Sequence, residues 1–242
     1  MTYSLEAAEI ATIRENSIQH KACRSCGTVL NKAEWFCPDC GKILPLPPEF
    51  NYFEVFGSGR KLRLDTAALE REFYRLSRRL HPDAFARASQ EEQEQSLVNS
   101  SLLNDAYRTL KDPIRRTEYL LRLEGILNTD EGGAKKDDRV PADLLEEVFE
   151  LNMQLDEMRM NREMGETDPQ LHKDLLAAKA NFDAQLKSAD ARLESLWDEW
   201  DASLEAGDER RKQSATESLA ALLDRRRYIR NLVNSVNEAL ES

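Results

Sequence analysis

The chain has 242 residues and a net charge of -11, because 45 acidic residues outnumber 34 basic ones. A surface that binds duplex nucleic acid must neutralise phosphates with Lys and Arg, so this charge argues against a nucleic-acid-binding protein. The length and the 40% hydrophobic content are sufficient for one large domain or two smaller ones.

The first twenty residues argue against a targeting segment. They contain no apolar stretch of signal-peptide length, and their three glutamates do not fit a transit peptide. No later stretch approaches the roughly 20 apolar residues of a membrane span. The cysteines all fall between positions 23 and 40, so no disulfide bond can cross-link the rest of the chain. We therefore expect a cytoplasmic protein, with residues 1–22 as an N-terminal tail.

Residues 23–44 predict a small metal-binding module. The spacing C-x2-C-x10-C-x2-C lets two tight turns present four thiolates to one tetrahedral ion, and a glycine follows each pair. The ligands are Cys23, Cys26, Cys37 and Cys40. A closed four-thiolate site favours structural zinc, but the same ligands suit iron in a rubredoxin-like site. A redox-active disulfide is less favoured, because each pair has a second pair nearby. The prolines at 45, 47 and 48 then predict an extended linker over 45–49.

The next segment predicts a helix with a cationic side and an abrupt end. Leu69, Phe73, Leu76 and Leu80 share one helical face. The other sides carry four arginines: Arg71, Arg75, Arg78 and Arg79. Pro82 lacks an amide hydrogen and restricts His81, so the helix must end near Leu80.

The stop places His81 and Asp83 at the tip of a loop held by a rigid proline. The arginines alone are compatible with an ordinary solvated face. His81 and Asp83 are also compatible with a general base and its orienting carboxylate. However, the sequence offers neither a serine elbow nor a spare cysteine as a nucleophile. A docking tip that pairs with a partner's cationic group is the better interpretation.

The C-terminal part, residues 141–242, predicts an antiparallel three-helix bundle. Its longest apolar stripe runs from Leu171 to Trp200 at steps of three and four. Gly165 and Gly207 divide the region into three helices. The polar, glycine-containing stretch 126–140 predicts a linker before it. The fold class is thus mainly α: a four-cysteine ribbon, a helical domain over 50–125 and the bundle.

The first helix of the bundle carries two apolar rows. Leu144, Val148, Leu151 and Leu155 form the row that we expect to enter the core. A second row, Leu145, Phe149 and Met153, recurs at steps of four beside it. This row either widens the core or meets a partner.

Four ordered blocks resemble a known family. "NYFEVFG" (51–57), "HPDAF" (81–85), "LNDAYRTLKDPIRRTEYLLRLEG" (103–125) and "ELNMQLDE" (150–157) are similar to the HscB co-chaperones of iron-sulfur cluster assembly. The resemblance covers about residues 50–242. It implies that 50–125 is a J-domain whose HPD tip, with Pro82, and arginine helix engage a DnaK/HscA-type chaperone and stimulate its ATP hydrolysis. Many members carry Lys where this chain has Ala84, and Arg87 lies one turn later.

The resemblance also implies that the second apolar row binds the IscU-type scaffold that carries the nascent cluster. The residues concerned are Leu145, Glu146, Phe149, Glu150 and Met153, with Tyr228 on the last helix. Members often have an apolar residue in place of Glu146 and Glu in place of Met153. Phe149 is the strongest candidate, because interface energy concentrates on large central anchors.

We therefore expect a non-enzymatic co-chaperone without nucleic-acid or membrane partners. The alternatives are a J-domain protein for a different client, a zinc-ribbon adaptor, and a hydrolase or redox enzyme that uses His81 or the cysteines. Nucleic-acid binding that falls steeply with salt, through phosphate contacts, would favour the adaptor. Turnover without any added chaperone would favour the enzyme.

Overall fold

A computed structural model describes residues 21–30, 34–47, 50–127 and 140–241. The described structure is mainly helical and divides into two compact units. Of the described residues, unit 1 contains those up to Gly59 and Asp65–Lys111, and unit 2 contains Arg60–Leu64 and those from Asp112 onward. The predicted J-domain segment, 50–125, therefore contributes to both units. Three predicted segments lie partly outside the described residues. These are the N-terminal tail at 1–20, the proline linker at 48–49 and the linker that follows the J-domain segment at 128–139.

Unit 1 begins with the four-cysteine ribbon. Strands β1 (Lys21–Ala22) and β2 (Val29–Leu30) pair antiparallel, with Ala22 opposite Val29. A single bridge joins Phe36 to Ile43 in the second half of the ribbon. Each half therefore folds back on itself around one cysteine pair.

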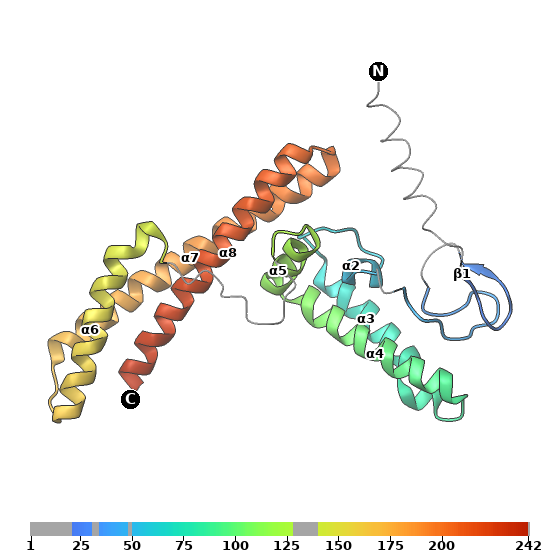
Figure 1. Ribbon diagram of the computed structural model, residues 1–242, viewed down its shortest axis with the longest axis horizontal. Helices are drawn as coiled ribbons and strands as arrows, with labels where there is room; N and C mark the ends of the chain where they lie inside the picture. Colours follow the sequence, from blue (N-terminus) through green and yellow to red (C-terminus); the bar gives the residue numbers. More distant parts are fainter. Residues whose placement is uncertain (1–20, 31–33, 48–49, 128–139, 242) are drawn as a thin grey trace, which may run out of the picture. The chain divides into compact units, whose positions relative to one another are not determined.

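The helices of unit 1 follow. They are α2 (Tyr52–Val55), α3 (Thr66–Leu80), the short 3-10 helix η1 (Pro82–Phe85) and α4 (Gln90–Lys111). Asn51 begins α2 with a capping box, and Asp65 caps α3 by accepting from the Ala68 amide. Helices α3 and α4 lie side by side (Figure 1). Leu76, Leu80 and Leu103 are buried between them, as the apolar period of α3 predicts.

The ribbon packs against these helices within the same unit. The buried Asn99 side chain on α4 donates to the Leu44 carbonyl at 2.9 Å. Lys42 forms an ion pair with Glu92 at 3.5 Å. Ile43 belongs to the same buried cluster as the leucines of α3 and α4. A buried hydrogen bond and shared apolar burial therefore fix the ribbon relative to α3 and α4.

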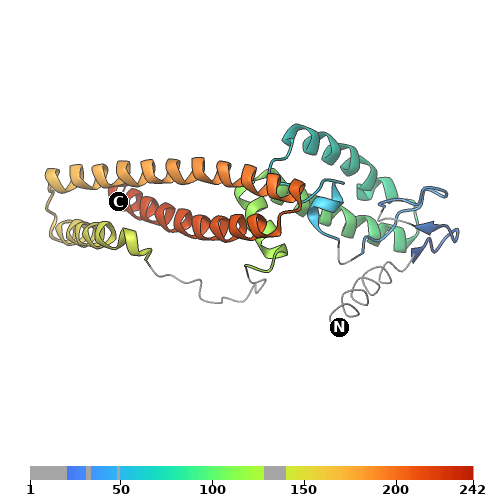
Figure 2. The ribbon, with the colours of Figure 1, turned by 90° about the horizontal axis from the view of Figure 1, so that it is seen from above.

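Unit 2 contains α5 (Pro113–Leu123), the 3-10 helix η2 (Ala142–Leu144), α6 (Leu145–Met164), α7 (Pro169–Ala206) and α8 (Glu209–Glu241). Figure 2 shows the long helices α7 and α8 running side by side, with α6 along one half of the pair. The two predicted glycines end α6 and α7 with φ of 72° and 64°. Helix α5 packs on α8 within unit 2.

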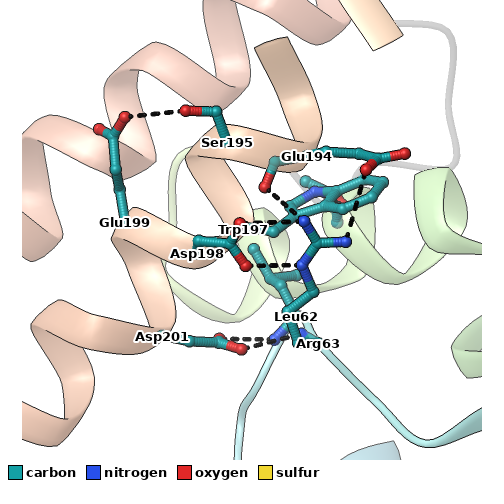
Figure 3. A network of polar contacts seen from close by, with 9 residues as sticks. Leu62, Arg63, Glu194, Ser195, Trp197, Asp198, Glu199 and Asp201 are labelled. Atoms are coloured by element: carbon teal, nitrogen blue, oxygen red, sulfur yellow. Dashed lines mark hydrogen bonds and ion pairs between the residues drawn. The ribbon is translucent and has the colours of Figure 1, made fainter. Parts of the chain in front are cut away.

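Segment 60–64 is held on α7 by a dense polar network within unit 2 (Figure 3). The Asp201 carboxylate accepts from the Leu62 and Arg63 amides at 2.8 and 2.9 Å. The Arg63 guanidinium donates to Asp198 at 2.7 and 3.0 Å and lies 5.5 Å from the Trp197 ring. Leu62 is fully buried, so this segment is anchored by both apolar and polar contacts.

Within the described ranges, none of the helices has the length and apolar character that crossing a bilayer requires.

Candidate metal centre and binding surfaces

The four predicted cysteines come together in one cluster. Their Sγ atoms all lie within 4.8 Å of one another, with Cys23 to Cys40 at 3.7 Å and Cys26 to Cys37 at 3.5 Å. Four thiolates around a tetrahedral zinc ion would be about 3.8 Å apart, given zinc–sulfur bonds of about 2.3 Å. The geometry therefore fits a metal ion bound by four thiolates.

Local backbone structure explains why the sulfurs converge. The Gly27 amide donates to the Cys23 carbonyl at 2.8 Å, and the Gly41 amide donates to the Cys37 carbonyl at 2.9 Å. Both glycines have positive φ, 77° and 72°, which a residue with a Cβ rarely adopts. Each cysteine pair is thus presented by the same tight turn. Because all four positions are filled by thiolates, a bound ion would have no open site for chemistry.

The end of α3 forms an exposed tip. The helix stops at Leu80, as Pro82 predicts, and His81 has an extended backbone with φ -60° and ψ 133°. The His81 and Asp83 side chains are 57% and 93% exposed. The Asp83 amide donates to His81 Nδ1 at 3.3 Å, and the two side chains approach to 3.5 Å. The imidazole and the carboxylate therefore contact each other and otherwise face solvent.

Helix α4 holds this tip in place. The Leu80 carbonyl, left without a helical partner at the end of α3, accepts from Ser96 Oγ at 2.6 Å and from Ser100 Oγ at 2.7 Å. Ser96 is completely buried. Neither serine was predicted from the sequence. They belong to a polar stretch whose positions relative to Leu80 depend on how α3 and α4 pack.

The four predicted arginines are exposed on α3, but they are not equivalent. Arg75 donates to Glu72 through Nε at 2.8 Å and through Nη2 at 2.5 Å. This contact lowers the pKa of Glu72 and raises that of Arg75. The Arg79 guanidinium lies 4.1 Å from the centre of the Phe36 ring. Arg71 and Arg78 form no ion pair with any residue in the described part of the chain.

The two apolar rows of α6 separate as predicted. Leu144, Val148 and Leu151 are buried in the core of unit 2, and Leu155 packs against it. In the second row, Leu145 is 54%, Phe149 68% and Met153 59% exposed. The predicted Glu146 and Glu150 are exposed beside this row.

Tyr228 on α8 occupies a different environment. It is half-buried and packs against the unit 2 core, and this burial raises the pKa of its hydroxyl. It is therefore less accessible than the row on α6. Met160 and Met164, 61% and 63% exposed, continue the second row to the end of α6. Their positions, seven and eleven residues after Met153, were visible in the sequence, but neither was predicted to belong to the row.

The chain was compared with known proteins, and the similar proteins are HscB co-chaperones. No protein-family model matches the chain. The iron-sulfur cluster co-chaperone protein HscB of Homo sapiens is 37% identical over 134 residues, 55% of each chain. The mouse protein of that name is 35% identical over 149 residues, 60% of this chain and 62% of the relative. A Vibrio cholerae HscB homolog is 49% identical over 76 residues, 31% of this chain and 44% of the relative. The chain spans about half the length of the curated relatives it matches.

Solved structures extend the match. The crystal structure of human HscB gives a TM-score of 0.62 at 27% identity and covers 90% of this chain and 98% of that one. The chain is similar to the HscB proteins in sequence and in fold. The HscB structure from Vibrio cholerae gives a TM-score of 0.53 at 28% identity, with 79% and 98% covered. The HscB resemblance inferred from the sequence blocks is thereby confirmed.

Proposed function

We propose that this chain is a non-enzymatic co-chaperone that stimulates ATP hydrolysis by a DnaK/HscA-type chaperone and delivers an IscU-type iron-sulfur scaffold to it. The observation that carries the proposal is the exposed His81 and Asp83 tip at the end of an arginine-bearing helix in a relative of HscB. A tip of this kind is suited to contact another protein, because its two polar side chains are accessible and their backbone is fixed.

The chaperone surface in this proposal consists of the tip, including Pro82, and the arginine face of α3. Pro82 and the two serine hydroxyls on the Leu80 carbonyl hold the tip rigid, so little conformational entropy is lost on docking. Asp83 supplies a charged acceptor, and Arg71 and Arg78, which form no ion pair with a described residue, supply guanidinium donors. Together they favour one orientation on a partner that offers a cationic donor to Asp83 and acidic acceptors to the arginines.

The scaffold surface in this proposal is the second row of α6. Leu145, Phe149 and Met153 offer apolar area, and Glu146 and Glu150 border it with negative charge. Tyr228, half-buried on α8, contributes at most its exposed edge. A chain that holds the scaffold here and the chaperone at the tip of α3 makes the encounter of those two partners effectively intramolecular.

The four cysteines in this proposal bind structural zinc. The ion would cross-link the two halves of the ribbon and supply folding free energy that its few apolar residues cannot. Metal analysis should find one zinc ion per chain. Stoichiometric iron, with thiolate-to-iron absorption in the visible range, would instead support the rubredoxin-like alternative.

The decisive experiment is a steady-state ATPase assay with the chaperone, with and without the scaffold. His81→Gln should reduce the stimulated rate to the basal rate of the chaperone, because the tip loses its imidazole. It should leave scaffold affinity unchanged. The matched control is His172→Gln, which removes an exposed histidine near the start of α7 and should stimulate like the wild type. Full stimulation by His81→Gln would refute the proposal. Stimulation that the scaffold does not increase would point to a different client.

A further inference from the structure

The cysteine ribbon and α3 together form a pocket. It has a volume of about 340 Å³ and lies wholly within unit 1. The ribbon supplies one wall and the arginine face of α3 supplies the other. The lining residues include Trp35, Phe36, Pro38, Arg75, Leu76 and Arg79.

The chemistry of the pocket is specific. Trp35 and Phe36 are half-buried aromatic side chains, and Leu76 is a buried residue of the lining. Arg79 lies over the Phe36 ring, so the aromatic face orients the guanidinium while its edge donors stay available. Arg75 is held at its position by Glu72. A planar cationic group beside apolar walls suits a carboxylate carried on a short aliphatic side chain.

The pocket is rigid enough to act as a binding site. The ribbon is fixed on α4 by the Asn99 to Leu44 hydrogen bond and by the ion pair of Lys42 and Glu92. Ile43 and Leu76 are buried in one apolar cluster. Both walls of the pocket therefore belong to one packed structure.

We propose that this pocket binds an acidic side chain of the ATPase chaperone, so that the cysteine ribbon forms part of the chaperone-docking surface. The proposal rests on the proposed function and extends it. The occupant follows from charge complementarity and position. Arg79 belongs both to the pocket and to the cationic face of α3, and it lies two residues before His81. A partner that covers His81 and the arginines therefore approaches the mouth of the pocket at the same time.

Trp35 provides a direct test. The chain contains three tryptophans, and the other two, Trp197 and Trp200, are buried in unit 2. In the metal-loaded, full-length protein labelled with 5-fluorotryptophan, the Trp35 fluorine signal should shift or broaden when the chaperone is added. The Trp197 and Trp200 signals should not change. Trp35→Phe assigns the Trp35 signal.

Affinity for the chaperone provides the second measurement. Phe36→Leu keeps an apolar side chain but removes the ring beneath Arg79, and it should weaken chaperone binding roughly tenfold. The control is Val29→Ala, which trims an exposed apolar residue of the same ribbon that does not line the pocket and should change the affinity less than about twofold. Metal content and circular dichroism establish that each variant is folded. If Phe36→Leu does not fold, Trp35→Ala replaces it with the same expected loss.

Three results would overturn the pocket proposal. The first is an unchanged Trp35 signal at saturating chaperone while His81→Gln still abolishes stimulation, which leaves the proposed function intact. The second is wild-type affinity of the pocket variants. The third is the same Trp35 shift with millimolar inorganic phosphate alone, which would make the pocket a general anion site. If His81→Gln stimulates normally, the proposed function itself fails and the pocket proposal fails with it.

Discussion

The arginine face of α3 and the second row of α6 are both exposed, but they differ in chemistry. The α3 face and its tip present charged groups, some of them already engaged by the chain itself, such as Arg75 by Glu72. The α6 row presents three large apolar side chains that are more than half exposed. Charged surfaces direct and orient association, whereas central apolar anchors supply most of the affinity.

The two surfaces should therefore respond to different perturbations. Chaperone binding should weaken with salt, because exposed charges are screened within about 10 Å at moderate ionic strength. Scaffold binding should depend on one or two apolar anchors. A perturbation confined to one unit is therefore the sharpest way to separate them.

Metal removal should have the largest effect on stability, and this effect should be confined to unit 1, which contains the ribbon and α3. Zinc coordination in small four-ligand modules contributes on the order of 10 kcal/mol, so we expect chelation to unfold the ribbon. Loss of amide protection over the described parts of the ribbon, residues 21–30 and 34–47, should follow and can be measured by hydrogen exchange. Scaffold affinity, measured by calorimetry, should change less than about twofold, because the α6 row lies in the other unit. Protection of the ribbon that survives complete metal removal would contradict this prediction.

Phe149→Ala tests the α6 side. Removing a large apolar side chain that becomes buried on binding costs about 1.5–3 kcal/mol, so scaffold affinity should fall about tenfold to a hundredfold. ATPase stimulation without scaffold should not change. The matched control is Leu97→Ala, which trims an apolar side chain on α4 of similar exposure, 58%. If Leu97→Ala weakens scaffold binding as much as Phe149→Ala, the row has no special role.

The sequence predicted the features that depend on local periodicity and on single residues. Pro82 ended α3 at Leu80, and steps of three and four separated the buried row of α6 from the exposed one. The cysteine spacing likewise predicted a converging cluster, since the turn geometry is local. Each of these depends on interactions within a few residues of the chain.

Contacts between distant segments could not be predicted in this way. Asp201 accepts from the Leu62 amide, 139 positions away, and Ser96 donates to Leu80 across the packing of two helices. The docking of the ribbon on α4 through Asn99 is of the same kind. One signal was available: Asp201 follows Trp200 on the apolar side of α7 and lies four residues after Trp197. An acidic residue at such a position needs an internal donor.

The smallest predicted effect is on the pH dependence of stability. It compares the buried Asp201 carboxyl with the exposed Asp198 carboxyl of the same network. Burial raises the pKa of Asp201, although its two backbone donors act in the opposite direction. The folded protein thus retains the proton at pH values where the unfolded chain, with a carboxyl pKa of about 3.9, has lost it. The contribution of this titration to stability is complete below about pH 3.9 and is lost as the pH rises through the folded-state value.

Asp201→Asn removes this titration, and Asp198→Asn removes one of opposite sign. We expect wild type to lose stability relative to Asp201→Asn as the pH rises from about 4.5 to about 7. Arg63 lowers the pKa of Asp198, so its contribution is present above about pH 3.9 and is lost as the pH falls. The difference between wild type and Asp198→Asn should therefore be larger at pH 7. Urea unfolding followed by tryptophan fluorescence measures both differences. If both variants respond to pH with the same sign, burial does not determine how the Asp201 carboxyl titrates.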